Sequence, residues 1–150
     1  MFITLQDIYK IENICLYIWN VKTLSKLKKE LDAIFSRYIR LRYASVEGIT
    51  KCFTCDKVAH YKKMHAGHFM SRRHHATRWN EDNVQVQCVG CNLFKQGEQY
   101  TFGKLLDIRV GDGTSEELQE LSRTTVKYMR HEYDEMIKFY KEKVNAIKTD

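Results

Sequence analysis

Two CxxC motifs, CFTC at residues 52–55 and CVGC at residues 88–91, decide the fold of this 150-residue chain. A CxxC turn places two thiolates on one side of a metal ion, and two such turns complete a tetrahedral four-sulfur site for Zn²⁺. Because the chain shows no secretory segment, we expect reduced thiols rather than disulfides; buried thiols or a redox pair are the alternatives. The sequence therefore predicts one structural zinc ion, with the ligands Cys52, Cys55, Cys88 and Cys91.

The positive charge of the chain is concentrated in one segment. The net charge is +6, and residues 21–80 carry 14 Lys and Arg against 4 Asp and Glu. Such a segment suits a polyanion better than a small metabolite, although a solvated basic face is the alternative. The sequence has neither an apolar run of the roughly 18–20 residues that span a membrane nor the pattern of a signal peptide. We therefore expect a cytoplasmic protein with no membrane partner.

Hydrophobic periodicity predicts helices on both sides of an irregular centre. Apolar residues recur at helical spacing after two candidate N-caps, Thr4 and Thr23, which predicts helices at residues 4–18 and 24–41. Between them and the C-terminus we expect a short strand at 49–52, short strands and loops at 53–88, and short helices at 91–95 and 100–108. A capping box at residues 114–117 predicts one long helix that extends to residue 147.

Histidines and arginines gather between the two CxxC motifs. Five of the six histidines lie at positions 60, 65, 68, 74 and 75. A neutral histidine can take a proton from water or bind a metal ion, and the four cysteines leave these histidines free for another role. Histidine between two cysteine pairs, with Asn92 directly after the last cysteine, is the pattern of a ββα-metal (HNH) nuclease, where histidine activates water beside a hydrated Mg²⁺. For any single histidine, a surface or packing role is the alternative.

Several stretches resemble the phage NinG (Rap) recombination nucleases, namely SRYIRLRYA at 36–44, CFTC at 52–55, AGHF at 66–69, RWNEDN at 78–83 and QCVGCN at 87–92. The resemblance implies a metal-dependent endonuclease that cuts branched DNA, including Holliday junctions, during phage recombination. It implies that His68 is the general base, that Asn92 binds the catalytic metal and that Asn83 braces the loop between two strands. If the protein is phage-encoded, it would act in the host cytoplasm.

Two positions depart from the pattern of the family. Wider HNH nucleases have an Asp before the base histidine, whereas this chain has Gly67, which leaves His65 as the candidate for the second metal ligand. The family often has a His where this chain has Gln85, so we assign no catalytic role to Gln85.

We expect an α+β fold, mainly helical, in which helices flank a small zinc-stapled HNH-like core. The expected parts are an N-terminal helical region at residues 1–47, the nuclease core at 48–110 and a C-terminal helix at 111–150. The expected cofactors are a structural Zn²⁺ and a catalytic Mg²⁺ or Mn²⁺, and the expected reaction is hydrolysis of a DNA phosphodiester.

Arginines are the expected DNA contacts because guanidinium groups match phosphate in a bidentate way. The candidates are Arg72, Arg73 and Arg78 around the cut site, and Arg37, Arg40 and Arg42 along a second DNA arm, unless the latter are simply solvated. A homodimer is expected because the apolar faces of the two N-terminal helices need a partner, although the C-terminal helix could supply it. The rival functions are a non-catalytic zinc-stapled DNA-binding protein and an adaptor that binds a protein through its C-terminal helix.

Overall fold

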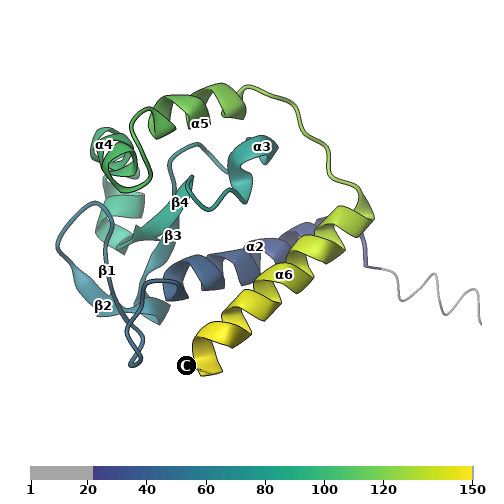
Figure 1. Ribbon diagram of the computed structural model, residues 1–150, viewed down its shortest axis with the longest axis horizontal. Coiled ribbons are helices and arrows are strands. Elements are labelled where there is room, and N and C mark those ends of the chain that lie inside the picture. The colour runs from purple at the N-terminus through teal and green to yellow at the C-terminus, as the bar shows by residue number, and fades with distance from the viewer. Residues whose placement is uncertain (1–21, 150) are drawn as a thin grey trace, which may run out of the picture.

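The computed structural model describes residues 22–149, in which helices pack around two small antiparallel strand pairs (Figure 1). In chain order the elements are α2 (Leu24–Leu41), β1 (Ile49–Lys51), β2 (Val58–His60), the 3₁₀ turn η1 (Tyr61–Lys63), β3 (His65–His68), α3 (His75–Arg78), β4 (Val84–Gln87), the π-helical turn η2 (Gly90–Phe94), α4 (Gln99–Arg109), α5 (Thr114–Ser122) and α6 (Arg130–Thr149). The prediction of mixed helix and small sheet is confirmed. The predicted helix at residues 4–18 lies outside the described residues. None of the described helices is long and apolar enough to cross a membrane.

Helix α2 forms where the leucine periodicity predicts it. The side chain of Thr23 accepts a hydrogen bond from the Lys26 amide at 3.3 Å, which caps the first turn. Leu27, Leu31 and Phe35 then follow at intervals of four residues and are buried, because side chains four positions apart lie on one face of a helix. This face forms one side of the main hydrophobic core.

Helix α6 covers the apolar face of α2. The two helices run side by side (Figure 1), and the buried residues of α6 are Tyr133, Ile137, Tyr140 and Val144. The rings of Phe35 and Tyr140 meet edge to face with their centroids 4.9 Å apart. The intramolecular alternative therefore accounts for the apolar face of α2. This face gives no support to the expected homodimer, which stays a prediction.

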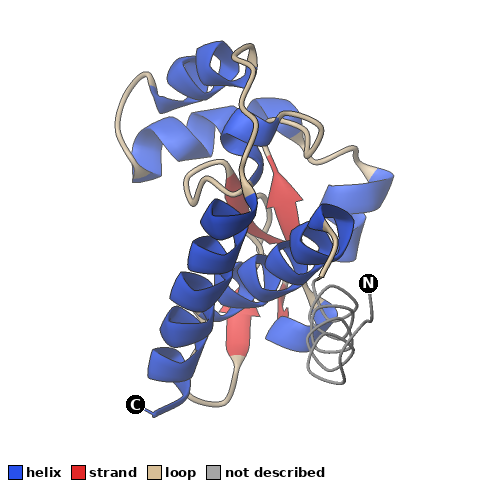
Figure 2. Ribbon diagram, turned by 90° about the vertical axis from the view of Figure 1, so that its right-hand side faces the viewer, coloured by secondary structure: helices blue, strands red, loops and turns tan. Residues whose placement is uncertain are grey.

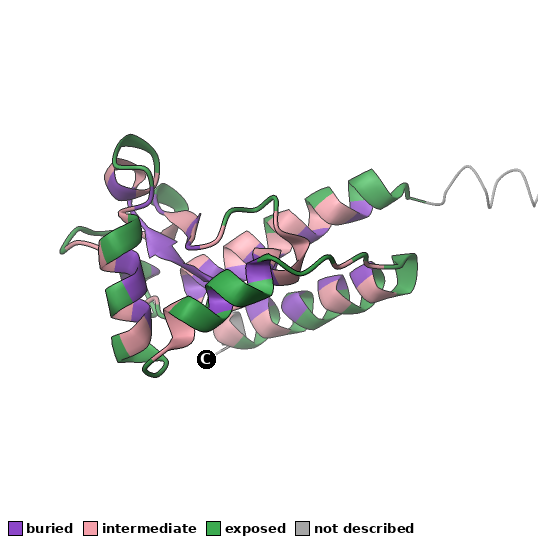
Figure 3. Cartoon of the chain, turned by 90° about the horizontal axis from the view of Figure 1, so that it is seen from above, coloured by how far each residue is buried: buried purple, intermediate pink, exposed green. Residues whose placement is uncertain are grey.

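The strands form two separate two-stranded sheets (Figure 2), one of β1 and β2 and the other of β3 and β4. Both pairs are antiparallel, and in the second pair His65 lies opposite Gln87 and His68 lies opposite Val84. All four residues of β4 are buried, and α2 packs against both β3 and β4. Buried positions therefore gather where α2, α6 and this strand pair meet (Figure 3).

The prediction of one long C-terminal helix is wrong. The chain forms α5 and α6, and residues 123–129 between them belong to neither helix. One reason for the break is local, because the run Thr124-Thr125-Val126 is β-branched and favours helix poorly. The other reason is a tertiary contact, in which Tyr128 packs edge-on against Trp79 with the ring centroids 5.6 Å apart. This contact returns the chain toward α2.

The first turn of α5 is capped by Asp107 of α4 and not by the predicted capping box at residues 114–117. The Asp107 carboxylate of α4 accepts hydrogen bonds from the amide and the hydroxyl of Ser115, both at 2.8 Å. An acidic side chain from a neighbouring helix thus satisfies the first turn of α5, where unpaired amides favour negative charge. The helices expected at 91–95 and 100–108 are observed as η2 and α4.

Candidate functional site

The four cysteines of the CxxC motifs form a candidate metal centre. Two of them follow β1 and two follow β4, and their sulfur atoms all lie within 4.8 Å of one another. A zinc–sulfur distance of about 2.3 Å places tetrahedral sulfurs roughly 3.8 Å apart, and the sulfurs of Cys55 and Cys88 are 3.8 Å apart. The chemistry and spacing of the donors therefore fit a zinc ion. The site could hold such a metal and would tie the β1–β2 pair to η2.

Hydrogen bonds from the backbone prepare one of these sulfurs for metal binding. The Cys88 amide donates to Cys52 Sγ at 3.2 Å. Burial raises the pKa of the Cys52 thiol, but hydrogen bonds from the amides of Cys88 and Thr54 and from the side chains of Thr54 and Cys55 together outweigh burial and lower that pKa to about 7. Since the thiolate is the form that binds metals, this geometry favours the ligating state.

Strand β3 places the two central histidines on opposite faces of its sheet. Successive side chains of a strand alternate between faces, so His65 and Gly67 share one face while Ala66 and His68 share the other. His65 meets Asn92 of η2, whose side-chain nitrogen donates to His65 Nδ1 at 3.0 Å. His68 instead lines a cavity against α2. The structure thus brings His65 and Asn92 together and leaves His68 on the other side of the strand.

The hydrogen bond of His68 determines which of its nitrogens carries a lone pair. Its Nε2 lies 3.0 Å from the Arg78 carbonyl oxygen, and a carbonyl can only accept, so Nε2 carries the proton and Nδ1 carries the lone pair. Burial lowers the pKa of His68 to about 4, with the charge of Arg72 acting in the same direction, although hydrogen bonds to the backbone of Arg78 and Ala66 oppose the shift. The imidazole is therefore neutral near pH 7 and can accept a proton at Nδ1.

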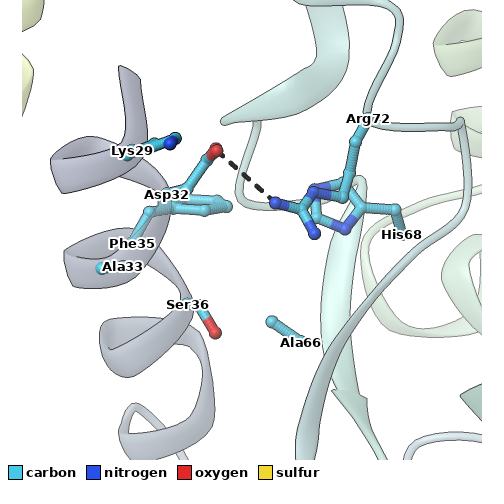
Figure 4. Close-up of a pocket in the computed structure, with 8 residues that line it drawn as sticks. All are labelled: Lys29, Asp32, Ala33, Phe35, Ser36, Ala66, His68 and Arg72. Carbon is cyan, nitrogen blue, oxygen red and sulfur yellow. Dashed lines mark hydrogen bonds and ion pairs between the residues drawn. The ribbon is translucent and has the colours of Figure 1, made fainter. Parts of the chain in front are cut away.

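The cavity beside His68 has a volume of about 360 Å³ and opens between α2 and β3 (Figure 4). Its polar lining consists of Lys29, Asp32, Ser36, His68 and Arg72. Sequence reasoning missed the three α2 residues in this set. Their spacing of three and four positions puts them on one helical face, which was the signal that could have found them.

The Gln87 side chain occupies the space where a side chain at position 67 would begin. A Cβ atom built on Gly67 would lie 2.0 Å from Gln87 Oε1, which is far inside van der Waals contact. Gly67, which stands where wider HNH nucleases have an Asp, therefore suits the close contact between β3 and the Gln87 side chain of β4. Ligation by His65 would also require a change, because its Nδ1 lone pair accepts the hydrogen bond from Asn92.

Asn83 braces the loop that connects β3 to β4. The residue is fully buried. Its Oδ1 accepts from the Met70 amide at 2.6 Å, and its Nδ2 donates to the carbonyls of Met70 and Thr77 at 3.0 and 2.9 Å. One side chain thereby holds both ends of the loop whose Arg78 carbonyl orients His68.

Two of the arginines predicted to contact DNA are engaged within the protein. Arg42, whose side chain is 8% exposed, donates to the carbonyls of Glu81 and Val84 and to Gln85 Oε1. Arg78 forms a two-armed ion pair with Asp32, with contacts of 2.9 and 2.6 Å. These guanidinium groups contact internal acceptors and so have a role in the fold, while DNA contact by Arg42 and Arg78 stays a prediction.

The other predicted arginines differ in how accessible they are. Arg40 is partly buried and donates to the carbonyls of Ser36 and Tyr61. Arg37 is partly buried, whereas Arg72 and Arg73 are exposed. Arg72 reaches Asp32 at 3.4 Å with a side chain that is 59% exposed. The most accessible of the predicted DNA contacts are thus Arg72 and Arg73, of which Arg72 lines the His68 cavity.

The fold and this site define a mixed helix and sheet protein with a four-cysteine cluster that could hold a metal such as zinc, and with a buried histidine in a cavity against α2. The chain belongs to the NinG family, because the family model described as Bacteriophage Lambda NinG protein matches residues 16–150. A comparison with curated proteins found no match, and neither did a comparison with solved structures.

Proposed function

We propose that this NinG-family protein is a metal-dependent DNA endonuclease of the HNH type that cuts branched DNA, such as Holliday junctions, during phage recombination. The observation that carries the proposal is the state of His68. It is neutral, its Nε2 is held by the Arg78 carbonyl and it lines a cavity with basic groups. A histidine held in one tautomer beside cationic side chains is suited to take a proton from water that attacks a phosphate.

The proposed task of His68 is to accept a proton at Nδ1 from the attacking water. Arg72 and Lys29 line the same cavity and would bind the phosphate oxygens, since cationic groups stabilise the charge that develops on phosphorus. The Ser36 hydroxyl also lines this cavity and could donate a hydrogen bond to a phosphate oxygen. Burial raises the pKa of the Asp32 carboxyl, but Arg78, Trp79 and Arg72 together outweigh burial and lower it, so Asp32 keeps its negative charge. Arg73, on the same exposed loop, would contact the neighbouring backbone.

The donor set around η2 fits a hard divalent cation. Asn92 Oδ1 takes no part in the hydrogen bond to His65, and amide oxygens suit Mg²⁺ and Mn²⁺. When bound, the cation would supply positive charge on the Asn92 face of β3, whereas His68 lines the cavity on the opposite face. His65 would hold the Asn92 carboxamide in place. The four cysteines would hold the structural Zn²⁺ and keep η2 in register with β3.

The preference for branched DNA and the homodimer rest on family resemblance. A four-way junction has two equivalent strands to cut, and a C2 dimer offers two copies of one site. A protein of this kind encoded by a phage would work in the cytoplasm of its host.

The alternative is a zinc-stapled DNA-binding protein without catalysis. One observation favours it: within residues 22–149, the four cysteines are the one group of three or more His, Cys, Asp or Glu side chains close enough to hold a metal. The adaptor alternative has no comparable observation in its favour.

Cleavage of labelled DNA by the zinc-loaded protein separates these functions. A four-way junction and a linear duplex of the same sequence would be incubated with the protein in Mg²⁺, in Mn²⁺ and without an added divalent ion. We expect incision that requires the added ion and is faster on the junction. Tight binding of both DNAs with no incision in either ion would refute the nuclease and favour the binding protein.

A further inference from the structure

The nitrogen of the Gln87 carboxamide has hydrogen-bond partners within residues 22–149, whereas its oxygen has none. Gln87 is the last residue of β4, and its Nε2 donates to Thr54 Oγ1 at 2.9 Å and to the Gly97 carbonyl at 2.8 Å. Since a carbonyl can only accept, these contacts fix which end of the carboxamide is nitrogen. The other end, Oε1, is a buried oxygen with no hydrogen-bond partner among residues 22–149. Such orphaned acceptors destabilise a fold and are rare in native proteins.

The unpartnered oxygen belongs to the face of the sheet that meets Asn92. Gln87 lies directly opposite His65 in the register of β3 and β4, and opposed side chains lie on the same face. The oxygen fills the space above Gly67, where a Cβ would come within 2.0 Å of it. Asn92 reaches this face through its 3.0 Å hydrogen bond to His65. Two amide groups from β4 and η2 therefore border the same histidine.

We propose that Gln87 Oε1 is a ligand of the divalent cation and acts together with Asn92 Oδ1. The proposal rests on the proposed function, which requires such an ion. Amide oxygens are hard donors that Mg²⁺ and Mn²⁺ accept, whereas the His65 lone pair at Nδ1 is already used by Asn92. His65 is then a positioning residue, and Gln87 is the second oxygen ligand.

This ligand pair carries no negative charge. The affinity of a site for a hard cation rises with the number of charged ligands, so a site of two neutral amides binds the free ion weakly. Substrate phosphate then supplies the missing charge, as is common for Mg²⁺ sites that hold few protein ligands. Metal and DNA should therefore strengthen each other's binding, since such coupling is reciprocal.

Titration with Mn²⁺ alone tests the ligand role without DNA and without cleavage. The amount of unbound Mn²⁺ would be followed by electron paramagnetic resonance in the zinc-loaded full chain. Gln87→Glu keeps an oxygen and adds a charge, while Gln87→Met has a similar length and no oxygen. Both lose the Nε2 donor, so a purely structural role would shift Mn²⁺ affinity in the same direction. Thr54→Val is the matched control, because it removes a partner of Nε2 and leaves Oε1 intact.

The ligand role predicts shifts in opposite directions. Gln87→Met should weaken Mn²⁺ binding by about tenfold or more, and Gln87→Glu should tighten it by about tenfold, since metal affinity depends on ligand number and charge. Thr54→Val should stay within about twofold of the wild type. Each protein should retain about one zinc ion per chain, which confirms that the cysteine site is intact.

The assignment is overturned if both Gln87 variants shift affinity the same way, if Thr54→Val reproduces Gln87→Met, or if the wild type binds no Mn²⁺ up to about 10 mM. Cleavage of DNA by the wild type is measured separately. If the wild type cleaves DNA while Gln87→Met binds Mn²⁺ normally, the ligand role fails and the proposed function stands. If Mn²⁺ affinities follow the expected order in a protein that cleaves no DNA, the ligand role stands and the proposed function fails.

Discussion

Removal of the Asp32 carboxylate should destabilise the fold strongly. Asp32 lies on α2 and accepts hydrogen bonds from Arg78 Nε at 2.9 Å, from Arg78 Nη2 at 2.6 Å and from Trp79 Nε1 at 3.0 Å. The Asp32 and Arg78 side chains are only 19% and 15% exposed. Breaking a buried ion pair by removing one partner typically costs about 3–5 kcal/mol, because the remaining charge is uncompensated. Since both groups keep some exposure, we expect Asp32→Ala to lower the free energy of unfolding by about 3 kcal/mol.

Urea denaturation of the zinc-loaded protein, followed by circular dichroism, measures this loss. The matched control is Glu30→Ala, which removes another acidic residue of α2. Glu30 pairs with Lys22 and Lys141, whose side chains are 55% and 52% exposed. Such exposed pairs contribute about 0–1 kcal/mol, so the control should lose less than about 1 kcal/mol. If Asp32→Ala loses no more stability than Glu30→Ala, the reasoning from burial is refuted.

A double-mutant cycle separates the orphaned charge from the lost contact. Arg78→Met removes the buried charge and keeps much of the apolar stem. The double variant Asp32→Ala with Arg78→Met should therefore be less destabilised than the sum of the two single variants, because no uncompensated charge remains. Additive losses would show that the two side chains do not depend on each other.

Three further predictions concern metal, pH and DNA. A strong chelator should abolish the cooperative melting of the protein, because metal binding to four thiolates is coupled to folding; unchanged melting of the metal-free chain would contradict a structural zinc. The pKa of His68 falls from 6.5 to about 4 on folding, so the unfolded state binds the proton first and stability is lost as pH falls through this window. Between pH 7.5 and pH 5 the free energy of unfolding measured by urea titration should fall by about 2 kcal/mol more for the wild type than for His68→Gln. Equal decreases in the two proteins would show that His68 is not buried in its neutral form. Replacing Arg72 and Arg73 with Ala should lower the slope of DNA affinity against salt concentration by about one to two units, whereas an unchanged slope would place the DNA elsewhere.

Local patterns in the sequence predict much of this fold. The spacing of Leu27, Leu31 and Phe35 predicts the extent of α2, and the two CxxC motifs predict the four-cysteine cluster that the fold assembles. Both signals are local, because helical periodicity and CxxC turns depend on residues within a few positions of each other.

Long-range contacts decide what the sequence could not predict. The end of α5 depends on Tyr128 meeting Trp79, which is 49 positions away along the chain. Arg42 and Arg78 look like DNA contacts in sequence, yet their internal acceptors Glu81 and Asp32 lie 39 and 46 positions away along the chain. The separation of His65 from His68 follows from the alternation of side chains along a strand, once the bounds of β3 are known.

The role of His68 is the central claim, and single-turnover cleavage of a four-way junction by His68→Ala tests it most directly. The reaction would contain zinc-loaded protein and Mg²⁺ or Mn²⁺, with His131→Ala as the control because His131 is an exposed histidine of α6. Loss of a general base should lower the cleavage rate by about 10²–10⁴, while zinc content and DNA binding persist and the control cleaves normally. A folded His68→Ala protein that cleaves the junction at the wild-type rate would contradict the account.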